Sequence, residues 1–144
     1  MEIERIPLPT HGDDRGLLVA LEETRHVPFE IRRVYYLFGT RRGVHRGQHA
    51  HRHLRQLAVA LHGSVTLLLD DGSGPVEAVL DDPAQGLLLG RMVWRDLYDF
   101  SDDCVLMVLA DQPYDPDDYI TDYDAFLREV NGAAPAEGIA WPGR

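Results

Sequence analysis

The chain has 144 residues and a mass of 16.2 kDa, enough for one domain with its own hydrophobic core. Its 14 basic residues are all arginine, and 24 acidic residues bring the net charge to -10, which argues against a protein that coats nucleic acid. Seven of the arginines and four of the seven histidines fall within residues 32–55, a stretch without Asp or Glu. This stretch predicts a local site for a compact anion on an acidic protein.

No stretch approaches the ~20 apolar residues that a membrane span needs. The first residues, MEIERIPLPT, lack the basic start and apolar run of a secretory signal. The single cysteine, Cys104, excludes an intrachain disulfide and lies in an apolar run, so we expect it in the core. We therefore expect a cytoplasmic protein that has neither a membrane nor a nucleic acid as its partner.

Short strand-like runs separated by turn residues occupy the first 110 positions. The expected strands are 17–21, 31–38, 57–61, 65–69, 76–80, 87–89, 92–97 and 104–109. Their spacing of roughly 8–12 residues predicts a β-sandwich or barrel. A parallel α/β fold needs long helical crossovers between its strands, and the chain has no room for them.

The C-terminal part differs from the rest of the chain. Tyr123, Phe126, Leu127 and Val130 follow the spacing of an amphipathic helix, which the sequence Asn-Gly at 131–132 should end. Residues 115–118 read as a turn and as the N-cap of this helix. We expect a single domain over residues 1–132 and a loose Pro-, Gly- and Ala-rich tail over 133–144.

The segment 43–63 is the most informative part of the sequence. If residues 49–53 form a strand, His49, His51 and His53 point to one face, because side chains alternate along a strand. Neutral imidazoles placed in this way are good metal ligands. Their ordinary pKa of ~6.5 also suits proton transfer near neutral pH. The spacing alone leaves both uses open.

This segment resembles the first motif of the cupin superfamily, the small β-barrels of jelly-roll type. The matching positions are Gly43, His49, His51 and Gly63. Cupins that bind metal carry Glu where this chain has Gln56, and a further His where it has Leu97. The resemblance implies an all-β cupin jelly-roll barrel with a short C-terminal helix, in which two of the four usual metal ligands are absent.

Over residues 5 to 130 the chain resembles one metal-free branch of the superfamily, the dTDP-sugar 3,4-ketoisomerases. The matching segments are DRG (14–16), VPFEIRRVYY (27–36), RGQHAH (46–51), LDDG (69–72), FSDDCVLMVLA (100–110) and YDPDDYI (114–120). The resemblance implies a homodimeric isomerase that uses no metal or other cofactor. Such an enzyme moves the ketone of dTDP-4-keto-6-deoxyglucose from C-4 to C-3.

The predicted catalytic residues are His49, His51 and Tyr35. Moving a carbonyl by one carbon requires a base that takes the proton next to the ketone and a donor that returns a proton to the old carbonyl carbon. Two histidines on one face can hold one proton between them, because the doubly charged pair is disfavoured. Either histidine fits the role of base, and Tyr35 is the best hydroxyl to polarise the sugar oxygen or relay a proton.

Arginines are the predicted substrate-binding residues. Guanidinium groups bind phosphate oxygens through two parallel hydrogen bonds. Arg33 shares a strand face with Tyr35, and Arg46 precedes the histidine pair, so these two are the candidates for the diphosphate. The resemblance places Arg15 and Arg95 at the pocket edge, where it implies contact with the hexose. Gln56 is expected to hold an imidazole or to form an ordinary strand hydrogen bond.

Other residues in the same segments have simpler interpretations. His45, His53 and His62 read as polar surface residues. Tyr36 and Trp94 read as core or dimer-interface residues. The arginines expected to be solvated charges, paired in part with the acidic surface, are Arg41, Arg42, Arg52 and Arg55. Three alternative functions stay open: another nucleotide-sugar cupin such as an epimerase, a metal-dependent oxygenase, and a non-catalytic nucleotide-sugar binding module. The sequence also leaves open the configuration of the product at C-4.

Overall fold

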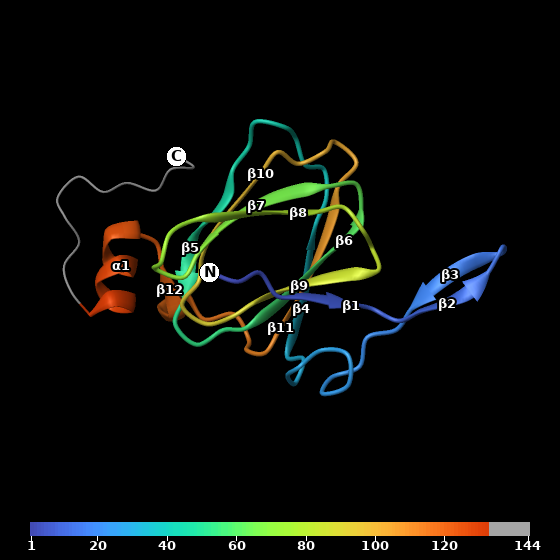
Figure 1. The fold of residues 1–144 in the computed structure, drawn as a ribbon, viewed down its shortest axis with the longest axis horizontal. Helices are drawn as coiled ribbons and strands as arrows, with labels where there is room; N and C mark the ends of the chain where they lie inside the picture. The colour runs from blue at the N-terminus through green and yellow to red at the C-terminus, as the bar shows by residue number, and fades with distance from the viewer. Residues whose placement is uncertain (133–144) are drawn as a thin grey trace.

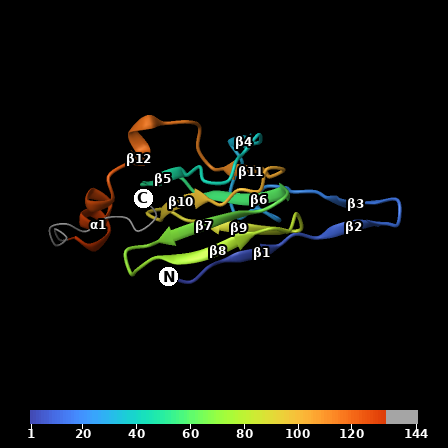
Figure 2. The same cartoon turned by 90° about the horizontal axis from the view of Figure 1, so that it is seen from above.

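In the computed structural model, which describes residues 1–132, two five-stranded antiparallel sheets pack face to face (Figures 1 and 2). The first sheet has the order β1 (Arg5–Pro7), β9 (Gln85–Leu89), β6 (Gln56–His62), β11 (Val105–Ala110) and β4 (Arg33–Leu37). The second has the order β12 (Tyr119–Ile120), β5 (Arg46–His51), β10 (Trp94–Tyr98), β7 (Val65–Asp70) and β8 (Val76–Leu80). The predicted all-β jelly-roll fold is confirmed, and the predicted strands within it end within two residues of their expected bounds.

The alternation of side chains along the strands builds the core between the two sheets. Leu67 and Leu69 of β7 face inward from one sheet, and Leu106 of β11 faces them from the other, all without exposed surface. Burial of such apolar surface is the main stabilising contribution to a sandwich of this kind. Cys104 is buried in the same cluster, as predicted.

A two-stranded hairpin projects from one end of the sandwich (Figures 1 and 2). It consists of β2 (Thr10–Asp13) and β3 (Gly16–Val19), which pair only with each other. The strand expected over 17–21 is therefore part of this hairpin and not of the barrel. Leu17 and Leu18 lie on it and are exposed.

At the opposite end, helix α1 (Tyr123–Asn131) covers the edge of the second sheet (Figure 1). It begins at Asp122, whose carboxylate accepts a hydrogen bond from the backbone N–H of Ala125 at 3.2 Å, and it ends at Gly132 in the left-handed conformation. Tyr123, Phe126 and Leu127 are buried, so the predicted amphipathic helix is present.

The predicted turn over 115–118 is present, but it does not cap helix α1. It forms a separate 3-10 turn, η1 (Pro116–Asp118), with Asp115 as its own N-cap. The chain then adds the short strand β12 to the edge of β5 before α1 begins. Within residues 1–132, no helix has the length and apolar character to cross a membrane. The predicted tail over 133–144 lies outside the described residues.

Candidate active site

Strand β5 carries His49 and His51 on its inward face. The strand bulges before them, because Gly47 and Gln48 adopt positive φ angles of 89° and 53° and the pairing with β10 shifts at Arg95. A Cβ atom on Gly47 would lie 3.2 Å from the Arg95 carbonyl oxygen, so glycine allows this close approach. The two imidazole rings meet edge to face, with centroids 4.8 Å apart. The strand ends at His51 and the side chain of His53 is exposed, so only two of the three histidines share a face.

Arg95 of β10 lies directly opposite His49 in the sheet and is 2% exposed. Its guanidinium donates hydrogen bonds to the Val93 carbonyl oxygen at 2.9 Å and to the side-chain oxygen of Gln56. The Gln56 amide in turn donates to the Tyr35 hydroxyl oxygen at 3.0 Å. The Gln56 side chain therefore links Arg95 to Tyr35 and does not hold an imidazole, which was one of its two expected roles. Because Tyr35 accepts this bond, its own proton stays available to a ligand.

Burial beside a cation keeps both histidines neutral. Desolvation, followed by the charge of Arg95, lowers the pKa of His49 to about 4 and that of His51 to about 3. Burial lowers the pKa of Arg95 to about 10, so its guanidinium remains charged at neutral pH. Burial also raises the pKa of Tyr35. The site thus presents two neutral bases, a protonated phenol and a fixed positive charge.

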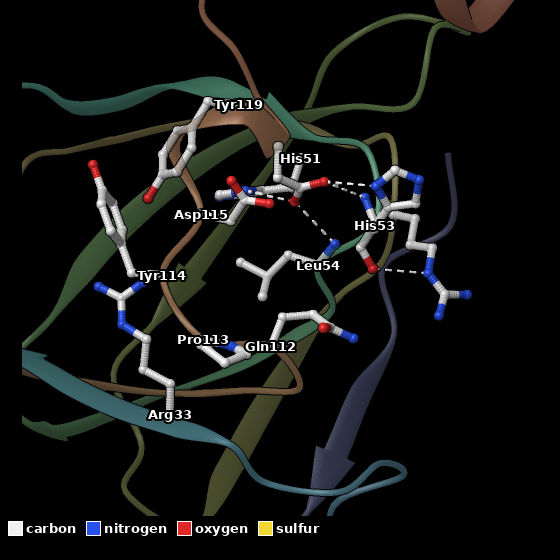
Figure 3. A pocket seen from close by; sticks show the side chains of 11 residues that line it. Arg33, His51, His53, Leu54, Gln112, Pro113, Tyr114, Asp115 and Tyr119 are labelled. Atoms are coloured by element: carbon white, nitrogen blue, oxygen red, sulfur yellow. Dashed lines mark hydrogen bonds and ion pairs between the residues drawn. The ribbon is translucent and has the colours of Figure 1, made fainter.

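A cavity of about 690 Å³ opens between the edge strands β4 and β12, and His51 lines it (Figure 3). This volume lies within the usual range for sites that bind small molecules. Arg33 reaches it from β4, with its guanidinium carbon 4.8 Å from the Tyr35 ring centroid and 5.3 Å from that of Tyr114. The structure therefore places Arg33 and His51 in one cavity, with Tyr35 against Arg33 and His49 against His51.

Tyr119 and Asp118 also belong to the site, although the sequence assigned neither of them a role. The Tyr119 ring centroid lies 4.3 Å from that of His51 and 4.8 Å from that of His49. Asp118 lies directly before it, and its carboxylate is 3.3 Å from His51. Both residues belong to the segment YDPDDYI (114–120), which matched the family. Nothing in its spacing predicts that it lies beside the histidines.

Of the predicted substrate-binding residues, only Arg33 lines this cavity. Arg95 and Gln56 lie in the buried hydrogen-bond chain described above, and Arg46 and Arg15 lie further away. Arg46 is exposed at the start of β5 and lines a smaller cavity of about 150 Å³ together with Leu37 and Phe38. Arg15 lies in the turn of the β2–β3 hairpin, where its side chain is 87% exposed and forms an ion pair with Asp13 at 2.7 Å. Substrate contact by Arg15 and Arg46 stays a prediction.

Most other arginines of the segment 32–55 are held by acidic side chains. The ion pairs are Arg32–Glu30, Arg42–Asp99, Arg52–Glu129 and Arg55–Asp111, with distances of 2.5 to 3.2 Å. Within residues 1–132, Arg33, Arg41 and Arg46 have no carboxylate partner. The number of arginines available for an anionic ligand is therefore much smaller than the composition indicated. In the same part of the chain, no three His, Cys, Asp or Glu side chains are arranged to hold a metal ion.

Known proteins with the same architecture identify the family. The family described as "FdtA: WxcM-like, C-terminal" matches residues 1–131. A TDP-4-oxo-6-deoxy-α-D-glucose 3,4-oxoisomerase from Aneurinibacillus thermoaerophilus is 51% identical over 118 residues, which cover 82% of this chain and 85% of the relative.

Two solved structures extend the likeness to the fold. A 3,4-ketoisomerase from Helicobacter canadensis has a TM-score of 0.88 and 40% identity, covering 91% of this chain and 98% of its own. A variant of the 3,4-ketoisomerase QdtA from Thermoanaerobacterium thermosaccharolyticum, in complex with TDP-4-keto-6-deoxyglucose, has the same TM-score and 36% identity, covering 90% and 94%. These matches confirm the resemblance found in the sequence, and the chain belongs to the FdtA-like family of sugar 3,4-ketoisomerases.

Proposed function

We propose that this chain moves the ketone of dTDP-4-keto-6-deoxyglucose from C-4 to C-3. The observation that carries the proposal is the pair of neutral histidines, His49 and His51, beside a buried Arg95 and a protonated Tyr35. These groups match the needs of a ketone shift: a base, an acid and a charge that stabilises an oxyanion. The relative at 51% identity carries the name of an oxoisomerase for the same sugar nucleotide.

The proton transfers balance without any other reactant. One histidine takes the proton from C-3, and the electron pair of that C–H bond forms the C-3=C-4 double bond while the ketone oxygen becomes an enediolate oxyanion. The oxygen at C-4 then gains a proton, and the hydroxyl oxygen at C-3 loses one. C-4 itself receives a proton from the site, which leaves the ketone at C-3 and a hydroxyl at C-4. Tyr35 is positioned to carry the oxygen-bound proton, since its hydroxyl accepts from Gln56 and is left to donate.

Arg95 supplies the electrostatic part of this mechanism. It is a buried cation that lies opposite His49, and its neighbours Gln56 and Val93 hold it in place without neutralising its charge. Negative charge that develops on the sugar during the reaction therefore meets a fixed positive charge at low solvent exposure. The same cation disfavours protonation of the resting histidines and so keeps them ready as bases.

Proton exchange tests the proposed function directly. When dTDP-4-keto-6-deoxyglucose is incubated with the protein in deuterated water, we expect deuterium on the hexose and a product with its ketone at C-3. Nuclear magnetic resonance of the product measures both, together with the configuration at C-4. Binding of dTDP without deuterium uptake would favour a binding module, and inversion of a centre without movement of the ketone would favour an epimerase.

The diphosphate is assigned to arginines that no carboxylate neutralises. We expect Arg33→Ala and Arg46→Ala each to weaken dTDP binding by ~1.5–3 kcal/mol, the usual loss for a hydrogen bond to a charged group. Arg42→Ala is the matched control, because Arg42 is paired with Asp99 at 2.5 Å. Isothermal titration calorimetry gives the dissociation constants. An unchanged constant in either test variant would remove that arginine from the phosphate site.

A homodimer is part of the proposal. Edge strand β4 presents an apolar outer face, on which Val34 is 54% and Tyr36 62% exposed, and covering such a face favours association. Arg15 lies in the turn of the hairpin that projects from the sandwich (Figure 2), so we assign its substrate contact to the cavity of a second copy. Light scattering measures the mass of the particle in solution. A mass of 16.2 kDa would contradict the dimer.

We also propose that the enzyme works in the cytoplasm. A nucleoside-diphosphate sugar carries charges that keep it from crossing a lipid bilayer unaided. Its enzyme therefore works in the compartment where the nucleotide is made. Cell fractionation followed by an activity assay on each fraction checks this, and activity confined to the membrane or exported fraction would contradict it.

A further inference from the structure

We propose that Asp118 is a positioning residue for His51, fixing the proton of the neutral imidazole on Nδ1 so that Nε2 carries the lone pair. The inference rests on the proposed function, because it concerns how one of the two bases is prepared for the reaction. It concerns a residue that neither touches the reacting carbons nor belongs to the histidine pair. Its basis is the way the carboxylate is held beside the buried ring.

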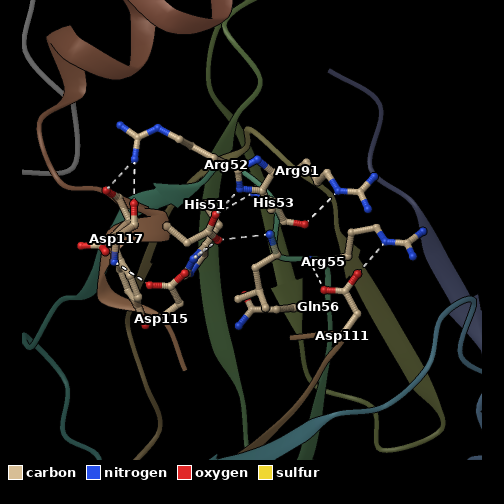
Figure 4. Close-up of polar contacts among 12 residues, drawn as sticks. His51, Arg52, His53, Arg55, Gln56, Arg91, Asp111, Asp115 and Asp117 are labelled. Atoms are coloured by element: carbon tan, nitrogen blue, oxygen red, sulfur yellow. Dashed lines mark hydrogen bonds and ion pairs between the residues drawn. The ribbon is translucent and has the colours of Figure 1, made fainter. Parts of the chain in front are cut away.

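The Asp118 carboxylate is held by three donors of the turn between β5 and β6. Figure 4 labels His53 of this turn and His51, which precedes it. Its Oδ1 accepts from the His53 backbone N–H at 2.8 Å and contacts His53 Nδ1 at 2.9 Å. Its Oδ2 accepts from the Leu54 backbone N–H at 3.2 Å. The residue is 9% exposed, and these hydrogen bonds hold its pKa below the usual value despite burial, which acts in the opposite direction. Asp118 is therefore an immobilised anion.

This anion lies against one nitrogen of His51. Its Oδ2 is 3.3 Å from Nδ1 of His51, which is an ion-pair distance without the alignment of a full hydrogen bond. His51 is 2% exposed, and within residues 1–132 its Nδ1 has no hydrogen-bond partner. A neutral imidazole carries one N–H and one lone pair, and a carboxylate beside Nδ1 favours the tautomer with the proton there. The lone pair then resides on Nε2.

Asp118 has the opposite effect on His51 from the other charged groups around the ring. The groups that face the ring from the neighbouring elements are Arg95 of β10, His49 of β5, and Asp118 and Tyr119 of the loop that ends in β12. Arg95 opposes a positive charge on His51, whereas Asp118 is the one group in this set that favours it. When His51 accepts a proton during turnover, Asp118 therefore stabilises the imidazolium that forms.

The loop that carries Asp118 has anchors of its own. The Arg52 guanidinium donates to the Asp117 carbonyl oxygen at 3.0 Å and pairs with Glu129 of α1 at 2.7 Å. The backbone N–H of Arg52 donates to the Asp118 carbonyl oxygen at 3.1 Å. Asp118→Asn leaves these contacts in place and keeps an oxygen for His53, while its amide nitrogen replaces the oxygen that accepts from Leu54. The substitution removes the charge, and the Arg52 contacts still hold the loop.

Asp118→Asn tests the proposal, with Asp117→Asn as the matched control that removes the same charge from the exposed neighbouring residue. We expect Asp118→Asn to lower kcat for the ketone shift about 10- to 100-fold, the usual effect of losing a carboxylate that orients a functional imidazole. KM and the dTDP dissociation constant should stay within about twofold of the native values. Asp117→Asn should keep the native kcat.

Nitrogen-15 spectra of the histidine rings report the tautomer directly, with the His51 signals assigned by comparison with His51→Asn. The native protein should show His51 protonated on Nδ1, and Asp118→Asn should move the proton wholly or partly to Nε2. A native His51 protonated on Nε2 would overturn the inference, even if Asp118→Asn fails to fold. An unchanged tautomer and kcat in Asp118→Asn would overturn it as well. Absence of ketone shift in the native protein would instead reject the proposed function and leave the tautomer prediction standing.

Discussion

Replacing either His49 or His51 with Asn lowers turnover by at least ~100-fold, the usual contribution of a general acid or base. Asn keeps part of the volume and polarity of the side chain but cannot take up a proton. Both rings lie inside the site with centroids 4.8 Å apart, and both are neutral at pH 7. Affinity for dTDP should change little, because the lost groups act on the hexose and not on the diphosphate.

Steady-state kinetics and calorimetry on the same preparations separate the two effects. His62→Asn is the matched control, because His62 is exposed and its closest charged partner is Asp103 at 3.3 Å, on the outside of the barrel. This control should keep the native turnover. Near-native activity of His49→Asn or His51→Asn would remove that histidine from the mechanism and leave the other as the acid–base group.

Replacing Arg95 with Met removes the buried positive charge while keeping a long side chain in the barrel. We expect kcat to fall by about 10²- to 10³-fold, the range measured when a group that stabilises an oxyanion is removed. The pH profile should change in a defined direction. The charge of Arg95 lowers the pKa of both histidines, so its loss raises these pKa values toward the ordinary ~6.5. A base is inactive below its pKa, and the acidic limb of kcat/KM therefore moves to higher pH.

The native enzyme should lose activity only as the pH falls toward about 4, the pKa of His49. In Arg95→Met, the same loss should begin at a pH nearer to neutrality. Arg95→Lys keeps the charge and should keep the acidic limb close to its native position, even if the geometry of the Gln56 contact is lost. Circular dichroism monitors folding of both variants. An acidic limb at the native pH in Arg95→Met would show that Arg95 does not control the histidines.

The sequence predicts the parts of the site that depend on local geometry. The alternation of side chains along a strand is enough to place His49 beside His51 and Arg33 beside Tyr35, and both placements are correct. The same periodicity locates most strands and helix α1. The same reasoning wrongly places His53 on this face, because β5 ends at His51. Beyond that point the His53 backbone bonds to Asp118, which is distant in the sequence.

Contacts between distant segments could not be predicted in this way. Gln56 contacts Tyr35 and Arg95 because β6 and β4 both flank β11 in one sheet, and this sheet faces β10 of the other. The local sequence does not predict how these strands are arranged. Asp118 was expected to form only a turn, since a short acidic run has no periodicity that points to His51. The sequence predicts that arginines of the basic segment pair with acidic side chains. It does not predict which ones, because the partners of Arg52 and Arg55 come from distant segments.

The short strand β12 has a consequence for the order in which the enzyme becomes competent. It places Tyr119 beside His51, so residues that follow every strand of the first sheet complete a site whose histidines come earlier in the chain. Every strand of the first sheet is finished by Ala110, whereas the aromatic and acidic neighbours of the imidazoles follow later. A nascent or truncated chain that ends at Ala110 has the histidines without Asp118 and Tyr119. We therefore expect catalytic competence only after the segment that follows β11 has been made.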